Sequence, residues 1–225
     1  MRRAVRGLST VLVIVGVLLL ADVAATLVWQ EPISGVYARA QQKRLADRLA
    51  AIERVPVTPV ERKVLDRLPA GAPRLGFAAR SLDRRVDEGG PVGRIKVGKI
   101  GLDEVVVQGT GTGDLRRGPG HYPDTPLPGA RGTVAVAGHR TTYGAPFRRL
   151  DQLGRGDRIE MLMPYGRFTY TVERTRIVPP TATWVTDRAA QDRLVLTACH
   201  PLYSAAQRIV VFARLSSSSA RGATA

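Results

Sequence analysis

The single cysteine of this 225-residue chain, Cys199, is the first candidate for chemistry. It follows the β-favouring residues 195–197 and precedes His200 and Pro201. Because proline cannot donate to a sheet ladder, the strand predicted here ends at Pro201 and presents Cys199 at its end. A thiol in that place becomes a nucleophile when a base or a cation lies beside it. Without such a neighbour, a lone buried cysteine is inert packing.

Three histidines could supply the base. His200 is adjacent to Cys199, but successive side chains of a strand point to opposite faces, so it is poorly placed unless the following turn brings it round. His121 lies in a Gly/Pro-rich loop, and His139 follows a small-residue strand and a glycine. Either could lean over a neighbouring strand end, and spacing alone does not choose between them. For each, a surface or structural role is the alternative.

Arg208 is the candidate cation, nine positions after Cys199 at the start of the apolar run 209–212. A guanidinium fixed beside a thiol could stabilise the oxyanion of a tetrahedral intermediate and hold peptide carbonyls. The alternative is an edge-strand arginine that pairs with a carboxylate or with solvent.

The charge and composition of the chain limit the classes of molecule that it could bind. The formal net charge is +15, and the excess is mostly arginine because the chain has only four lysines. The arginines are scattered without interleaved aromatics, and no helix-turn-helix, zinc-finger or ribonucleoprotein signature is present, so no nucleic acid partner is predicted. A basic surface that faces solvent, an anionic membrane or a wall polymer is the prediction. One cysteine excludes an internal disulfide and a multi-cysteine metal site, and we predict no cofactor and no metal site, calcium included.

Residues 8–29 are predicted to form a transmembrane anchor, since 22 mostly apolar residues make about 33 Å of helix against a hydrocarbon core of about 30 Å. Arginines at positions 2, 3 and 6 place residues 1–7 in the cytoplasm and the rest outside. The alternative is a cleaved signal peptide with its core at 8–20 and its cleavage site at 23–25.

Residues 30–91 are predicted to be an extracytoplasmic stalk, with a helix at 37–54 and a Pro/Gly-rich linker at 55–91 that holds one short helix at 60–68. From residue 92 the pattern changes to short β runs, which predicts an all-β barrel or sandwich over 92–215. Seven strands are predicted: 93–100, 104–108, 132–137, 157–163, 168–178, 193–199 and 208–215. The length of the loop 109–129 indicates a functional role for it. Residues 216–225 are predicted to be a flexible tail.

Three separated motifs resemble the sortase family, most closely the class E type of actinobacteria. They are Gly-Pro-Gly-His-Tyr-Pro-Asp-Thr at 118–125, Ala-Gly-His-Arg-Thr-Thr-Tyr-Gly-Ala-Pro-Phe at 137–147, and Leu-Thr-Ala-Cys-His-Pro-Leu-Tyr-Ser-Ala-Ala-Gln-Arg at 196–208. The resemblance implies a closed sortase β-barrel of about eight strands with an N-terminal membrane anchor. It implies that His139 is the catalytic histidine, Cys199 the nucleophile and Arg208 the catalytic arginine.

The resemblance also implies a substrate site that includes Tyr122, Thr125, Thr197 and Ala198. The family usually has Thr-Leu-x-Thr before the cysteine, whereas Val195 and Ala198 stand at the two outer positions here. Tyr122 matches a loop tyrosine of the class E relatives. In those relatives this tyrosine is linked to a preference for Ala at the second position of the sorting signal. Thr197 could substitute for the hydroxyl missing at position 198, but its side chain is directed differently.

The activity implied is that of a membrane-anchored cysteine transpeptidase. Such an enzyme cleaves a Leu-Ala-x-Thr-Gly or Leu-Pro-x-Thr-Gly sorting signal between Thr and Gly through a thioacyl intermediate. It then transfers the exported protein to an amine of a peptidoglycan precursor. The sequence leaves open the substrates, the acceptor amine, Ala against Pro at the second position, general anchoring against pilus assembly, and the oligomeric state.

Two other functions remain open. The first is another cell-wall Cys/His peptidase or an L,D-transpeptidase, although the latter normally has its histidine much closer in sequence to a Gly-Cys pair. The second is a non-catalytic, basic, wall-binding membrane protein with an inert cysteine.

Overall fold

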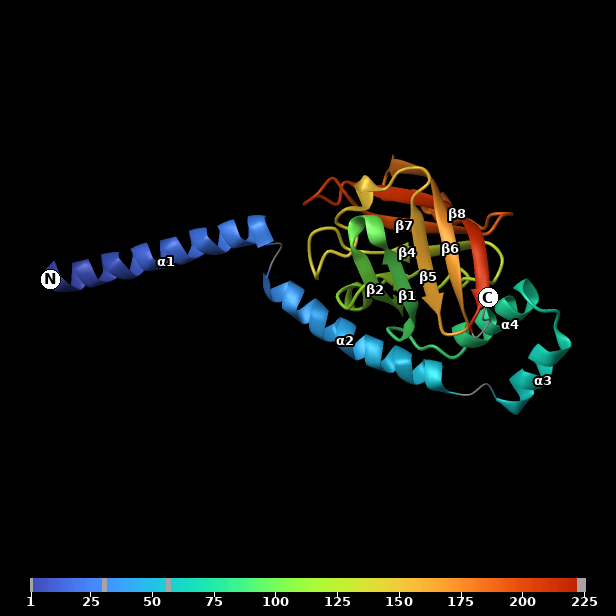
Figure 1. The fold of residues 1–225 in the computed structure, drawn as a ribbon. Coiled ribbons are helices and arrows are strands. Elements are labelled where there is room, and N and C mark those ends of the chain that lie inside the picture. The colour runs from blue at the N-terminus through green and yellow to red at the C-terminus, as the bar shows by residue number, and fades with distance from the viewer. Residues whose placement is uncertain (1, 30–31, 56–57, 222–225) are drawn as a thin grey trace.

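The computed structural model describes residues 2–29, 32–55 and 58–221. Four helices come first in this part of the chain, and a β-barrel follows them (Figure 1). The helices are α1 (Arg2–Trp29), α2 (Pro32–Arg54), α3 (Pro59–Arg67) and α4 (Ala72–Asp83). The helix α1 extends away from the barrel, whereas α2 runs along it.

The barrel is closed, with the strand order β1-β2-β3-β4-β7-β8-β6-β5 and a return pairing of β5 with β1. The strands are β1 (Pro91–Val97), β2 (Leu102–Gln108), β3 (Gly120–His121), β4 (Thr133–Ala137), β5 (Arg158–Met163), β6 (Gly166–Val178), β7 (Arg193–His200) and β8 (Gln207–Ala220). The predicted barrel of about eight strands is therefore confirmed. Each of the seven predicted runs contains a strand, and only the two-residue β3 was not predicted.

Alternation along β7 and β8 separates the inside of the barrel from its outer face. Leu196 and Ala198 of β7 belong to the main core, together with Ile209 and Val211 of β8. The intervening residues, Cys199 among them, therefore face outward. This alternation decides which side of the barrel carries the thiol.

The helix α4 corrects the prediction that residues 55–91 are a linker outside the core. Its Leu75, Ala79 and Leu82 are each at most 3% exposed and belong to the main core cluster of the barrel. The sequence predicted the neighbouring helix α3 but not α4. The segment just before β1 is thus part of the folded unit.

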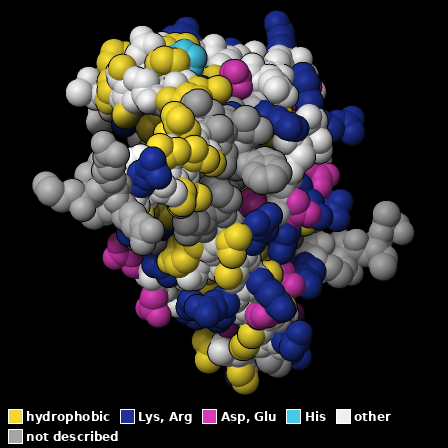
Figure 2. Space-filling view, turned by 90° about the vertical axis from the view of Figure 1, so that its left-hand side faces the viewer, with side chains coloured by type: hydrophobic (Ala, Val, Ile, Leu, Met, Phe, Trp, Pro, Cys, Tyr) yellow, Lys and Arg dark blue, Asp and Glu magenta, His cyan; other side chains and the backbone are white. Residues whose placement is uncertain are grey.

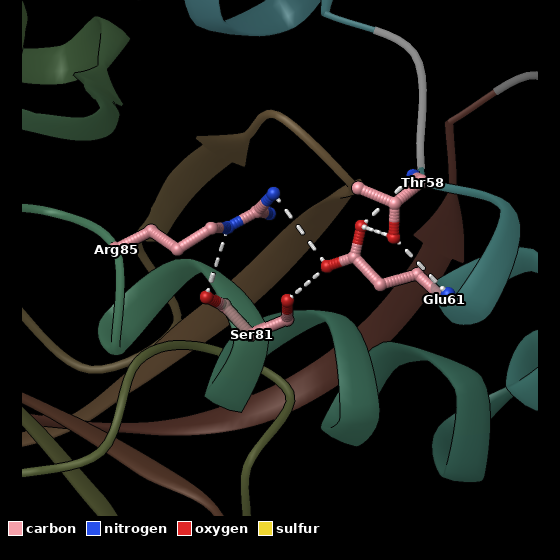
Figure 3. Close-up of polar contacts among 4 residues, drawn as sticks. All are labelled: Thr58, Glu61, Ser81 and Arg85. Atoms are coloured by element: carbon pink, nitrogen blue, oxygen red, sulfur yellow. Dashed lines mark hydrogen bonds and ion pairs between the residues drawn. The ribbon is translucent and has the colours of Figure 1, made fainter.

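A polar cluster joins α3 to α4 (Figure 3). Thr58 and Glu61 form a capping box at the start of α3, in which each side chain accepts from the other residue's backbone N–H. The Glu61 carboxylate also accepts a hydrogen bond from Ser81 and lies 3.5 Å from Arg85, both on the α4 side. These bonds hold the carboxylate in its charged form, and the pKa of Glu61 is lowered, chiefly by the Ser81 bond.

The strand β8 corrects the predicted boundary at residue 215. It continues to Ala220, where it pairs with Gly166 of β6, so most of the predicted flexible tail is strand. Residues 222–225 of that tail lie outside the described residues.

The helix α1 contains one 18-residue window, Arg6–Val23, with a mean hydropathy of 2.0. Within the described ranges it is the one helix that is long and apolar enough to cross a membrane. On the face of the molecule shown in Figure 2, Lys and Arg side chains are spread over the surface with Asp and Glu among them.

Candidate active site

The parallel pairing of β4 with β7 brings the end of β4, which His139 follows, beside the strand that carries Cys199. Ala137 is the register partner of Thr197, and the N–H of Gly138 donates to the Thr197 carbonyl at 3.0 Å. Cys199 lies two positions after Thr197 on β7, and His139 lies two positions after Ala137, just beyond the end of β4. Extending this register by two residues pairs His139 with Cys199, and we infer from it that the imidazole lies on the outer face near the thiol.

On the other side of Cys199 lies Arg208, its register partner in the antiparallel β7–β8 ladder. Paired residues project from the same face, so the Arg208 side chain also projects from the outer face. Its Nη1 donates to the carbonyls of Ala205 and Gln207, both at 2.9 Å. These bonds fix one nitrogen of the guanidinium on the β7–β8 turn, and Nε and Nη2 have no partner among the described residues.

The loop after β4 is folded so that His139 keeps its place. A Cβ at Gly138 would lie 2.7 Å from the ring of Phe147, so only glycine lets the fully buried Phe147 pack here. The N–H of Phe147 donates to the His139 carbonyl at 3.0 Å and closes the loop. The motif therefore carries Gly138, His139 and Phe147 at the positions that this closed loop requires.

The imidazole of His139 is half-buried, and its Nε2 is buried without a hydrogen-bond partner in the part of the chain that the structure describes. Its ring lies 5.4 Å from that of Tyr143. Burial, and then the nearby charge of Arg116, lower the pKa of His139. A buried nitrogen that lacks a partner is rare in proteins, and a catalytic site is one of the places where it occurs.

The structure argues against the two other histidines, His121 and His200, as the base for Cys199. His121 is 1% exposed, its Nδ1 lies 2.8 Å from the Gln108 amide oxygen, and burial lowers its pKa to about 4. The His200 Nδ1 lies 3.2 Å from Arg140, and His200 belongs to the opposite face of β7 from Cys199. Of the three histidines, His139 is therefore the remaining candidate for the base.

Arg140 was missed by the sequence analysis, although it follows His139 directly. It is 3% exposed, and its Nε and Nη2 both donate to the Arg148 carbonyl, at 3.3 and 3.1 Å. Its Nη1 lies 3.5 Å from the Cys199 carbonyl oxygen, and Nη2 forms an ion pair with Asp151 at 3.0 Å. This buried cation connects the histidine loop to the backbone of the nucleophile.

The residues expected to bind substrate have different surroundings. The Tyr122 hydroxyl lies 3.0 Å from the Thr197 hydroxyl, on the face that carries Cys199. Thr125 is 6% exposed, and its hydroxyl donates to the Tyr122 carbonyl and accepts from the N–H of Ala135, so it supports the loop.

Ala198 is 4% exposed, and its side chain lies in the barrel core. Its methyl group therefore faces away from the thiol, which argues against a substrate contact by this side chain.

The outer face of the sheet continues from Cys199 to Thr197 and Val195 of β7. Beyond Thr197 and Tyr122 it continues into a second, smaller cluster of buried apolar residues that the segment around η3 (Thr183–Thr186) covers. Its members are Ala135, Val178, Val185, Val195, Val210 and Phe212. The thiol and its register-paired guanidinium thus lie beside an apolar cluster that is itself covered.

A family profile described as the sortase domain matches residues 95–216, more than half of the chain. The chain therefore belongs to the sortase family, and the predicted membership is confirmed.

Sortase D of Bacillus subtilis (strain 168) is 34% identical over 126 residues, which cover 54% of this chain. The match spans 62% of that relative, less than two thirds of its length.

Solved structures support the same fold. A sortase E from Streptomyces avermitilis is 32% identical, with a TM-score of 0.56, and the match covers 60% of this chain and 93% of that one. A sortase D5 transpeptidase from Clostridium perfringens is 21% identical, with a TM-score of 0.63, and the match covers 79% of this chain and 99% of that one. The second similarity, at 21% identity, supports the barrel fold alone. Sortases named as D type and as E type are both among the relatives.

Proposed function

We propose that this protein is a cysteine transpeptidase that cleaves a sorting signal of exported proteins and joins them to an amine of the cell wall. The observation that carries the proposal is the register across three neighbouring strand ends. It pairs Cys199 directly with Arg208 and pairs Ala137 with Thr197, two positions before His139 and Cys199, in a barrel that belongs to the sortase family.

In the first step the Cys199 thiolate attacks the carbonyl carbon of the signal's Thr residue. The carbonyl oxygen gains the negative charge of the tetrahedral intermediate, and the Arg208 guanidinium stabilises it. Collapse of the intermediate breaks the Thr–Gly bond. The leaving glycine nitrogen takes a proton from the His139 imidazolium, and a thioester to Cys199 remains.

In the second step a neutral amine of the wall precursor attacks the thioester carbonyl. Its proton passes to the His139 imidazole, the new amide bond forms, and the Cys199 thiolate leaves. Because the pKa of His139 is lowered, neutral imidazole predominates at neutral pH. The reactive thiolate–imidazolium pair is then a minor form of the enzyme.

We infer that an extended sorting signal binds along the outer face beside Cys199. Tyr122 stands over this face through its contact with Thr197, two residues from the nucleophile. We infer that its ring limits the space for the second residue of the signal, which favours Leu-Ala-x-Thr-Gly over Leu-Pro-x-Thr-Gly. The Streptomyces avermitilis relative named as a sortase E supports this subclass.

The helix α1 supports membrane anchoring with the barrel outside the cell. Its apolar window can span a bilayer, and arginines precede it. Both proposed substrates, an exported protein and a wall precursor, are met at that surface.

The test is a cleavage assay with the full chain in detergent. Peptides that contain Leu-Ala-x-Thr-Gly and Leu-Pro-x-Thr-Gly are incubated with and without an amine, and products are identified by mass. We expect cleavage between Thr and Gly, and an amine-linked product when amine is present. Cys199→Ala, His139→Asn and Arg208→Ala should each lower kcat/KM by at least about 10³-fold.

His200→Asn is the matched histidine control and should stay within about tenfold of wild type. An intact Cys199→Ala activity, or cleavage at another bond, would sink the proposal. Cleavage without amine transfer would point to a cell-wall peptidase instead. No cleavage combined with an unreactive thiol would point to the non-catalytic wall-binding function.

A further inference from the structure

Tyr143 lies between the proposed catalytic histidine and the helix that follows the apolar segment. On one side its ring lies 5.4 Å from the ring of His139, at an interplanar angle of 39°. On the other side it lies 6.4 Å from the ring of Tyr37 in α2, edge to face at 71°. The Arg116 guanidinium lies 5.6 Å from the Tyr143 ring centroid. Tyr143 is thus in contact with α2 and with His139 at once.

The backbone of this loop is bound to α2 as well. The Tyr143 N–H donates to the Ser34 hydroxyl oxygen at 3.2 Å. A Cβ at Gly144 would lie 3.4 Å from the Cβ of Ala38, and Ala38 is only 5% exposed, so helix and loop approach closely. We call Ser34, Tyr37 and Ala38 the α2 clasp.

The clasped loop has a backbone that needs support. Tyr143, Gly144 and Ala145 have φ values of 50°, 76° and 43°. Three successive residues in the left-handed region are uncommon, and for the two that carry a Cβ this conformation is strained. Strained backbone persists where surrounding contacts over-determine it, and the α2 clasp supplies such contacts.

The helix α2 is itself fixed on the barrel. Gln42 donates to the carbonyls of Val105 and Arg117 at 3.0 and 2.9 Å and accepts from the Val105 N–H at 2.7 Å. Further along the helix, Leu45 and Leu49 are buried against β2. A helix held this firmly can determine where a loop residue sits.

We propose that Tyr143 is a positioning residue for His139 and that the α2 clasp holds it in place. The segment predicted to be a stalk is then a part of the catalytic centre's support and not a spacer. This inference rests on the proposed role of His139, but its main test needs no substrate.

The test follows the titration of His139 by NMR in the full chain, in detergent, with ring-¹³C-labelled histidine. The charged and aromatic groups near His139 are Arg116 and Tyr143, and Cys199 is its proposed neighbour. Tyr143→Ala and Tyr37→Ala should expose the imidazole and raise its titration midpoint toward the ordinary value. Tyr143→Phe and Tyr37→Phe keep the ring contacts and should titrate like wild type.

Leu49→Ala is the control on the same helix. It removes a buried contact with β2 away from Tyr143, so it should lower the melting temperature and leave the His139 midpoint unchanged. The proposal is overturned if neither alanine variant at Tyr37 or Tyr143 moves the midpoint, or if Leu49→Ala moves it as far. Should Tyr143→Ala fail to fold, Tyr37→Ala decides, because Tyr37 is 44% exposed.

The activity readout separates this inference from the proposed function. If the wild type cleaves the sorting peptide, Tyr37→Ala should lower kcat about tenfold with little change in KM, because substrate contacts remain while the histidine is misplaced. If the wild type cleaves no peptide, the proposed function fails, while the titration still decides whether the α2 clasp sets the position of His139.

Discussion

Arg140 brings a positive charge inside the protein, next to the groups proposed to react. A buried cation is costly unless it is paired and its donors are used. Here the fork of the guanidinium serves the Arg148 carbonyl, the Cys199 carbonyl and the Asp151 carboxylate together. A lysine ammonium cannot reproduce that planar set of donors. The arrangement identifies Arg140 as a support for the backbone of Cys199.

We expect Arg140→Ala to lower the free energy of unfolding by about 2 to 4 kcal/mol, because buried carbonyls lose their donors. Peptide cleavage should fall by at least about tenfold, and Arg140→Lys should recover stability more than activity. Urea unfolding and kcat/KM are the measurements. Arg149→Ala, at the exposed neighbouring position, is the control. An Arg140→Ala variant with wild-type kcat/KM would contradict this role.

Glu104 is a carboxyl group on the inner side of a strand. Leu102 and Val106 of β2 belong to the core, and alternation puts Glu104 on the same side, opposite Ile95 of β1. Burial raises its pKa to about 7, against a smaller lowering by Arg94. The folded state thus holds a proton here that the unfolded chain releases near pH 4.5.

This raised pKa predicts a pH-dependent stability. The contribution of Glu104 is fully present below about pH 4.5 and is lost as the pH rises through about 7, because the folded state must then bury a charge. Glu104→Gln should therefore match wild type at pH 4 and exceed its free energy of unfolding by about 2 to 3 kcal/mol at pH 8. The measurement is urea unfolding of the chain from Pro32 onward. The exposed Glu173→Gln is the control, and a difference that is constant with pH would refute the prediction.

At the scale of single residues, the sequence pointed to the proposed reacting groups but not to their supports. Motif order and resemblance pointed to His139, Cys199 and Arg208, and the strand register pairs the last two directly. The same alternation that turns Cys199 outward turns Ala198 inward, so its expected substrate contact could have been rejected from the sequence. The role of Tyr143 depends on how the loop returns toward α2, and no local pattern records that.

At the scale of elements, strands with clear alternation were predictable. The strand β3 was not, because two residues are too few for a period to show. The helix α4 was read as linker because Gly71, Pro73 and Gly76 look like breakers. Pro73 stands in the first turn, where proline is favoured, and Gly76 lies where an added Cβ would come within 3.2 Å of the Gly129 carbonyl oxygen.

The burial of α4 makes a prediction for its apolar face. Leu82→Ala should lower the free energy of unfolding by about 2 to 5 kcal/mol, as expected for a leucine truncated in a core. Val60→Ala on α3, at a position 73% exposed, should change it by less than about 0.5 kcal/mol. Urea unfolding of both variants compares the two helices directly. Equal effects would mean that α4 packs no more firmly than α3.

At the scale of the whole molecule, α2 and α4 belong to the same folded unit as the barrel. Val105 and Val107 of β2 are covered by α2, and the main core is completed by α4. A chain that begins at the predicted boundary near residue 92 would leave both surfaces open. A soluble form should therefore begin at Pro32, which omits the apolar helix α1 alone among the described helices.

Removing α1 then separates chemistry from tethering. The full chain and the chain from Pro32 should cleave a soluble sorting peptide with kcat/KM values within about threefold, because α1 extends away from the barrel and adds nothing to the site. Against a signal-bearing protein anchored in the same vesicles, the full chain should be faster by about 10²-fold, because a shared membrane raises the effective concentration.

The control re-attaches the shorter chain to those vesicles through a nickel-chelating lipid, which should restore the rate without restoring α1. A rate that stays low would show that α1 acts through specific contacts rather than through proximity. Equal rates for the free and the anchored enzyme on the membrane-bound substrate would remove the argument for an anchor. Because tethering and active-site geometry contribute independently, the α2 clasp variants should lose the same fraction of activity in solution and on vesicles.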